Sequence, residues 1–70
     1  MKYVAVIEKA GGGSYSAYVP DLPGCVSCGD SVEEVRQSIA EAVRLHVESL
    51  RQHGESVPPP RSTTTTIEAA

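Results

Sequence analysis

The chain contains two cysteines, Cys25 and Cys28, at the C-x-x-C spacing of redox motifs and zinc sites. In a redox motif the pair opens a helix, whose dipole lowers the pKa of the thiol. Here both residues fall in an expected strand, where side chains at this spacing point to opposite faces. Zinc needs four ligands, and without a second pair only a four-cysteine site shared by two copies remains. We therefore interpret both cysteines as small, partly buried apolar residues and expect no metal.

Three carboxylates and two histidines are the other residues that could carry chemistry. Glu8, Asp21 and Asp30 could hold the metal ions of a minimal nuclease, but they are dispersed over two strands and a turn. Solvated surface charge is the favoured interpretation. His46 falls on the apolar stripe of an expected helix and His53 at its end, which indicates a core-edge imidazole and a helix-terminal cation. The sequence predicts no catalytic residue, no cofactor and no enzyme.

The elements that position these residues begin with three strands, expected over about 2–9, 14–19 and 25–28. The first has apolar residues at both parities, which is typical of a central strand. Gly11-Gly12-Gly13 precedes no helix and no Lys-Ser/Thr pair, so it indicates a hairpin loop rather than a phosphate cradle. Pro20 and Pro23 flank an Asp-Leu pair and predict a turn, because each proline fixes its own φ and restricts the preceding residue. Together the strands form an antiparallel meander.

A long helix is expected over about 32–53. Ser31 and Glu34 have the spacing of a capping box, and Gly54 is a typical helix end. Arg44 and Glu48 have the spacing of an ion pair on the polar face. Apolar or core-edge side chains recur every three or four residues, and this stripe comprises Val32, Val35, Ile39, Ala42, Val43, His46, Val47 and Leu50.

The residues after the helix permit two interpretations. Ser62 to Ile67 holds four threonines and an isoleucine, which could be a low-complexity linker. We favour a short fourth strand over about 63–67, because β-branched residues suit strands and Pro58-Pro59-Pro60 would make a stiff return to the sheet. A right-handed crossover would then place it parallel to the first strand. The predicted fold class is α+β with β-β-β-α-β order in one domain, residues 1–70.

Bulk properties restrict the function. One helix covers one face of such a sheet, so the other face, with some of Val4, Val6, Tyr15 and Tyr18, needs another cover. We expect a homo-oligomer, either a dimer or a tetramer. A net charge of −3 with six scattered basic residues argues against a nucleic-acid surface and suits a basic protein partner. Without a long apolar segment or signal peptide, the sequence predicts a soluble cytoplasmic protein.

Four segments together resemble the HicB family of antitoxins, and they cover nearly the whole chain. Their sequences are Lys-Tyr-Val-Ala-Val-Ile-Glu-Lys from Lys2, Tyr-Val-Pro-Asp-Leu-Pro-Gly-Cys from Tyr18, Gly-Asp-Ser-Val-Glu-Glu-Val from Gly29 and Gly-Glu-Ser-Val-Pro-Pro-Pro from Gly54. The resemblance implies a partial ribonuclease-H-like fold. It also implies that the domain binds and neutralises a small, basic HicA-type toxin, which is an mRNA-cleaving ribonuclease. Asp21 and Asp30, at the expected sheet edge, are the candidates for partner contact.

Full-length members of that family commonly carry a C-terminal helix-turn-helix or ribbon-helix-helix domain that binds DNA. The sequence given ends at Ala70 without one, so no direct nucleic-acid binding is expected from this domain. Two other hypotheses stay open at this point. One is an orphan oligomeric interaction domain of the same fold without a toxin partner. The other is the minimal nuclease using Glu8, Asp21 and Asp30.

Overall fold

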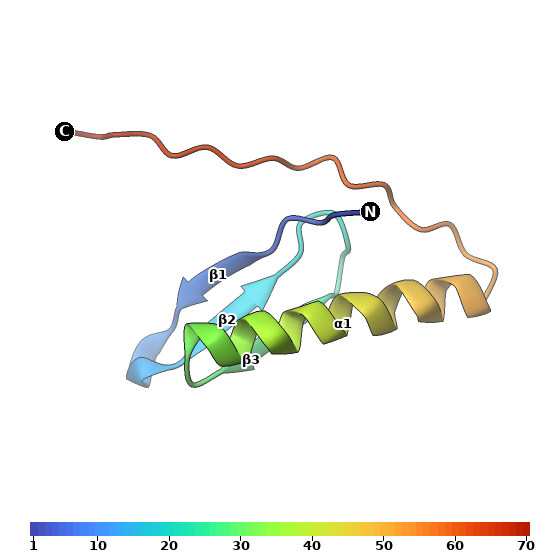
Figure 1. The fold of residues 1–70 in the computed structure, drawn as a ribbon, viewed down its shortest axis with the longest axis horizontal. Helices are drawn as coiled ribbons and strands as arrows, with labels where there is room; N and C mark the ends of the chain where they lie inside the picture. Colours follow the sequence, from blue (N-terminus) through green and yellow to red (C-terminus); the bar gives the residue numbers. More distant parts are fainter.

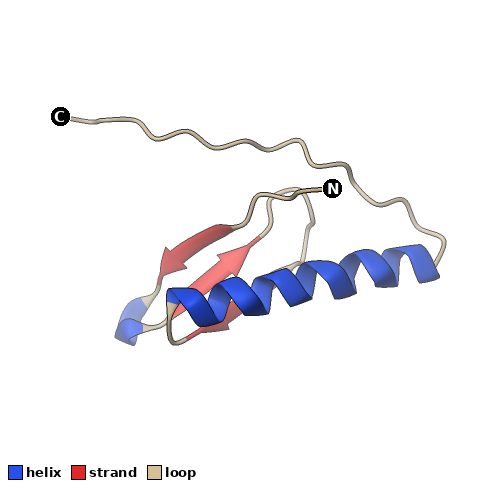
Figure 2. Ribbon diagram, viewed as in Figure 1, coloured by secondary structure: helices blue, strands red, loops and turns tan.

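The computed structural model describes residues 1–70 as a three-stranded sheet with one long helix on one face (Figures 1 and 2). Strands β1 (Val6–Lys9), β2 (Tyr15–Tyr18) and β3 (Val26–Gly29) pair antiparallel in the order β1-β2-β3. Helix α1 (Val32–Gln52) follows directly. The α+β class, the antiparallel meander and the long helix are thus confirmed.

The β1–β2 hairpin closes through the three glycines. Ala10 N–H donates to the carbonyl of Ser14 at 2.8 Å, and Gly11–Gly13 form one 3-10 turn between them. Gly12 and Gly13 have φ angles of 76° and 82°, in the left-handed region that glycine adopts without a Cβ penalty. The predicted hairpin loop is therefore confirmed, and conformational need explains the glycines.

Strand β1 begins four residues later than predicted, at Val6 instead of Lys2. Val6 lies opposite Tyr18, the last residue of β2, so the residues before Val6 would have to pair with Val19 and Pro20. Val19 lies opposite Cys25, and its N–H points toward the β3 side and donates to the Cys25 carbonyl at 3.1 Å. The N–H needed on the β1 side is that of residue 20, and a proline has none. β1 is also an edge strand in the observed order, not the central strand that its apolar pattern predicts.

The core lies between the helix and the β2–β3 half of the sheet. All of its buried side chains come from β2, the connection between β2 and β3, and the helix. They are Ala17, Val19, Leu22, Cys25, Val35, Ile39 and Val47. Leu22 is 0% exposed, because the turn between the two prolines inserts it beneath α1. Two hydrogen bonds close that turn: Leu22 N–H donates to the Val19 carbonyl, and Cys25 N–H donates to the Leu22 carbonyl. Gly24 has a φ angle of 84°, in the left-handed region that glycine adopts easily.

Both ends of α1 are capped. Ser31 Oγ accepts from Glu34 N–H at 3.1 Å, which is one half of the predicted capping box. The Glu34 side chain lies against Gly29 instead of reaching back to the cap. At the other end Gly54 has φ 67°, and Glu55 N–H donates to the Leu50 carbonyl at 2.9 Å, a Schellman arrangement. The helix therefore ends at Gln52, one residue before the predicted end.

The predicted fourth strand over 63–67 does not form. After the helix the chain turns back and runs opposite to α1, in the same overall direction as β1 (Figure 1). It contacts the N-terminal segment where Tyr3 hydroxyl donates to the Pro58 carbonyl, but it makes no ladder with β1. Threonines supply little apolar surface to hold such a segment down, and Ile67 is 78% exposed. The predicted fourth strand and its pairing are therefore wrong, although this segment runs in the same overall direction as β1.

Candidate binding surfaces

One face of the sheet carries no covering element. Register places Val6, Tyr18 and Val26 side by side across the three strands. The alternate row, with Ala17 and Ser27, faces the helix: Ala17 is buried and Ser27 Oγ hydrogen-bonds Ser38 Oγ of α1. Tyr18 and Val26 are therefore on the outer face, where they remain 41% and 65% exposed.

This outer row is the apolar surface expected from the sequence, with one difference. Val6 and Tyr18 lie on it as predicted, whereas Tyr15 packs against the core on the helix side. The second row of the outer face contains Glu8, Ser16 and Cys28, which register also aligns. An exposed apolar row beside a polar one is typical of a protein contact surface.

The two cysteines occupy opposite environments. Cys25 is 3% exposed, and burial raises the pKa of its thiol, which keeps it protonated and unreactive. Cys28 is exposed, so the expected partial burial is wrong for that residue, and neither cysteine forms a disulfide. The prediction that their side chains point to opposite faces is confirmed.

Asp21 anchors the C-terminal segment. Its Oδ2 accepts from Ser62 N–H and Arg61 N–H, both at 2.9 Å, and its Oδ1 accepts from Ser62 Oγ at 3.0 Å. The Ser62 and then the Arg61 backbone hydrogen bond hold the pKa of this carboxyl below its usual range. We call these three hydrogen bonds the Asp21 latch. Its partners lie 40 and 41 residues away in sequence, and no local pattern signals them.

Asp30, the second candidate for partner contact, lies at the opposite end of β3 from Asp21. It is exposed and precedes the helix N-terminus, which also carries the exposed carboxylates Glu33 and Glu34. The structure therefore does not unite Asp21 and Asp30 in one patch. Of the two, Asp30 is the one whose side chain is not already occupied by the protein's own backbone.

The three carboxylates of the nuclease hypothesis are also apart. Glu8 lies in β1, Asp21 in the turn after β2 and Asp30 after β3. No group of three or more His, Cys, Asp or Glu side chains is placed to hold a metal ion. His46 is half-buried on α1, and His53 caps the helix, its Nδ1 lying 2.7 Å from the Ser49 carbonyl.

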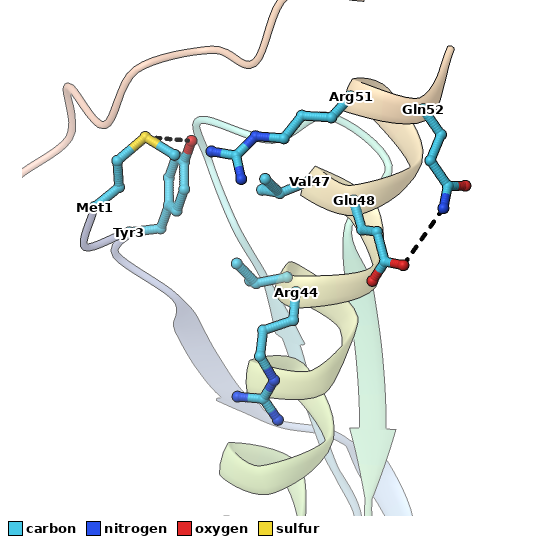
Figure 3. Close-up of a pocket in the computed structure, with 8 residues that line it drawn as sticks. Met1, Tyr3, Arg44, Val47, Glu48, Arg51 and Gln52 are labelled. Carbon is cyan, nitrogen blue, oxygen red and sulfur yellow. Dashed lines mark hydrogen bonds between the residues drawn. The ribbon is translucent and has the colours of Figure 1, made fainter.

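A groove that the sequence did not predict separates the N-terminal segment from α1. One part, of about 550 Å³, is mostly apolar, and its only charged lining residues are Arg36 and Arg44. A neighbouring part of about 640 Å³ shares Met1, Tyr3, Val43 and Arg44 with it and continues toward the helix end. Figure 3 shows this second part, with the Arg51 side chain extending from the helix toward Tyr3.

The sequence contains a pattern that fits one wall of this groove, but the pattern does not by itself predict a groove. Tyr3, Ala5 and Ile7 recur at strand spacing and line it from one side. The helical pattern places Arg44 on a polar helix face and predicts an ion pair with Glu48. Figure 3 shows instead that Glu48 accepts from Gln52 Nε2, at 3.4 Å. None of the helices reaches the length and apolar character needed to span a membrane.

Comparison with known proteins places this architecture in a family. Residues 3–70 match the model described as the HicB-like antitoxin of bacterial toxin–antitoxin systems. A UPF0150 protein of Thermoplasma acidophilum is 39% identical over 99% of this chain and 100% of its own length. Another, from Synechocystis sp., is 45% identical over 80% of this chain and 71% of its own.

A solved structure gives the same result for the fold. The crystal structure of the N-terminal domain of the Burkholderia pseudomallei antitoxin HicB is similar with a TM-score of 0.75 and 36% sequence identity. The match covers 84% of this chain and 69% of that one. The shared meander and helix, together with the family match over nearly every residue, show that this chain belongs to the HicB-like antitoxin family.

Proposed function

We propose that this domain binds a small, basic HicA-type ribonuclease toxin and blocks its cleavage of mRNA. The observation that carries the proposal is the family match over residues 3–70, supported by the structural similarity to a HicB N-terminal domain. The role is one of binding, not catalysis, and it is exercised in the cytoplasm, where an mRNA-cleaving toxin acts. Neither a cofactor nor direct contact with nucleic acid is part of this role.

The surface chemistry suits such a partner. A net charge of −3 gives an acidic protein that attracts a basic one, and this attraction speeds encounter more than it strengthens the final complex. The exposed apolar row with Tyr18 and Val26 supplies anchors of the kind that dominate affinity. Asp30, exposed at the start of α1, is the acidic contact we favour, and Asp21 acts chiefly on the C-terminal segment.

Self-association belongs to the same proposal. The outer sheet face and the groove beside α1 are both apolar and uncovered in a single chain, which favours a dimer or tetramer. The same observation supports the second candidate function, an orphan oligomeric interaction domain without a toxin. The two candidates differ only in whether a toxin is bound.

Co-expression with any small basic protein encoded next to this gene tests the proposal. The antitoxin should restore growth to cells in which that protein arrests it, and the two should co-purify. Asp30→Lys should weaken rescue, because it reverses a charge that faces the toxin. Glu55→Lys is the matched control, since it makes the same charge change at an exposed position after the helix.

Each result has a distinct meaning. Equal rescue by Asp30→Lys and Glu55→Lys would discard Asp30 as a contact while leaving the antitoxin role intact. Growth arrest that this chain cannot relieve, with no co-purification, would favour the orphan domain. Magnesium-dependent cleavage of RNA by the purified chain, abolished by Glu8→Gln, would overturn the non-enzymatic role.

A further inference from the structure

The groove between the N-terminal segment and α1 leaves apolar side chains uncovered beside an unpaired strand edge. β1 is an edge strand, so the backbone groups along its outer side have no strand partner. Beside that edge, Tyr3, Ala5 and Ile7 face the helix residues Ile39 and Val43 across the open groove. An extended segment placed here would pair with the edge and bury this apolar floor at once.

The chain itself contains a segment with the matching chemistry. Residues 63–68 read Thr-Thr-Thr-Thr-Ile-Glu, which is β-branched throughout its first five positions and carries one charge, a negative one. In the single chain this segment pairs with nothing and leaves Ile67 78% exposed. The groove offers Ile67 a matching floor, because most of the residues that line its apolar part are hydrophobic.

We propose that two copies of this chain exchange these segments, each adding residues 63–68 as a fourth strand beside residues 2–7 of its partner, which comprise the N-terminal segment and the start of β1. The partner chemistry is thus a second copy of the chain itself. This inference names the contact for the self-association included in the proposed function. It does not depend on a toxin, since the groove side chains that it uses, Tyr3, Ala5 and Ile7, lie on the opposite face of the sheet from Tyr18 and Val26.

Two-fold symmetry permits an antiparallel exchange. In Figure 1 the C-terminal segment runs in the same direction as β1 of its own chain. A two-fold axis that sets the β1 strands of the two copies antiparallel therefore presents each segment antiparallel to the β1 of the other copy. Such an isologous contact closes on itself and yields a dimer rather than a fibre.

Charge selects the same direction. With Ile67 placed over the groove opposite Tyr3, antiparallel pairing aligns Glu68 with Lys2 on the other face. The corresponding parallel pairing, with Ile67 opposite Ile7, aligns Glu68 with Glu8, and like charges directly opposite are destabilising. The antiparallel register also places Thr65 opposite Ala5.

The Asp21 latch prepares the segment for this exchange. It holds Arg61 and Ser62 against the turn of their own chain, so the strand that follows leaves from a fixed point. Tyr3 hydroxyl holds Pro58 in the same way. Little backbone freedom before residue 63 is then left to lose on pairing, which favours association.

Cysteine cross-linking tests the register directly. In a Cys28→Ser background, chains carrying Ala5→Cys are mixed with chains carrying Thr65→Cys, one of the two being enlarged by a tag, and oxidised after equilibration. The mixture should give a disulfide-linked heterodimer on a non-reducing gel. Thr64→Cys replaces Thr65→Cys in the control, and it should give at least tenfold less product because its side chain points to the other face.

Three outcomes would overturn the proposal. Equal cross-linking at positions 64 and 65 would mean random collision, and no heterodimer would mean that the strands do not meet. A disulfide that forms only within single chains carrying both Ala5→Cys and Thr65→Cys would mean that the segment occupies its own groove.

A second variant tests the contribution of the apolar anchor. Ile67→Lys should raise the dissociation constant of the dimer at least tenfold in sedimentation equilibrium, whereas Thr66→Lys, on the other face of the strand, should change it less than threefold. Because Ile67 is 78% exposed in the single chain, the protomer should keep its helical circular dichroism in both variants. An unchanged dissociation constant for Ile67→Lys would discard the exchange.

Discussion

The two halves of this small domain differ in how completely their side chains are buried. The covered half, residues 15–53, contains all seven of the buried core side chains, whereas the open half, residues 1–9 and 58–70, contains none. Apolar residues are present in both. The difference lies in cover: α1 lies over β2 and β3, while β1 borders the groove beside the helix.

This contrast shows that a place in the sheet does not by itself give a strand a buried, stabilising face. A strand can hold its ladder to β2 and still lack a packed face, because hydrogen bonds contribute little net free energy compared with apolar burial. The covered half can satisfy its own apolar surface, and the open half becomes complete only when another segment fills its groove. Three measurements would break or sharpen this comparison.

Leu22→Ala should have the largest effect. Leu22 is 0% exposed beneath α1, and a leucine-to-alanine change in a core costs about 2–5 kcal/mol in the free energy of unfolding. Leu45→Ala, at a helix position that is 58% exposed, is the control and should cost under about 0.5 kcal/mol beyond helix propensity. Chemical denaturation gives both values, and similar losses for the two variants would contradict the assignment of the core to the covered half.

Ser31→Ala should have an intermediate effect within the same half. It removes the side-chain acceptor for Glu34 N–H and should lower the free energy of unfolding by about 0.5–2 kcal/mol. Ser56→Ala removes the same hydroxyl at an exposed position after the helix and should leave the denaturation midpoint unchanged. A midpoint that does not move for Ser31→Ala would mean that the helix does not depend on this cap.

The smallest effect is expected from acid acting on the Asp21 latch, which ties the C-terminal segment of the open half to a turn of the covered half. The pKa of Asp21 is lower in the folded state than in the unfolded chain, because Ser62 and Arg61 N–H groups donate to the carboxylate. The latch is therefore fully present above the unfolded pKa and is lost as pH falls through the lowered folded pKa.

Nuclear magnetic resonance can follow this change at single residues. The amide signals of Arg61 and Ser62 should shift with the protonation of Asp21, while those of Val35 and Ile39 in the core stay fixed. Asp21→Asn should produce the acidic spectrum at neutral pH. A simultaneous change of core and latch signals would mean that the two halves unfold as one unit.

Local signals explain what the sequence predicted well. The turn between Pro20 and Pro23, the Ser31 cap and the Gly54 end each depend on residues within a few positions of one another, and all three formed where expected. The insertion of Leu22 into the core was not foreseen, because a single apolar residue in a turn has no periodicity to show which way it points.

Long-range contacts explain what it missed. The acceptor role of Asp21 depends on Ser62, and that of the Pro58 carbonyl on Tyr3, pairs separated by 41 and 55 residues. Apolar residues at both parities before and within β1 predict cover on both faces. They could not indicate whether the cover comes from the same chain, so a central strand was predicted where the single chain has an edge.

The Asp21 latch also bears on the order of folding. Its donors lie 40 and 41 residues from the carboxylate, so forming it early would require closing a long loop at a considerable entropic cost. The hairpins and the helix need only short loops and therefore form sooner. The C-terminal segment joins last and detaches first, so a newly made chain presents its finished helix and sheet before its final residues have found any partner.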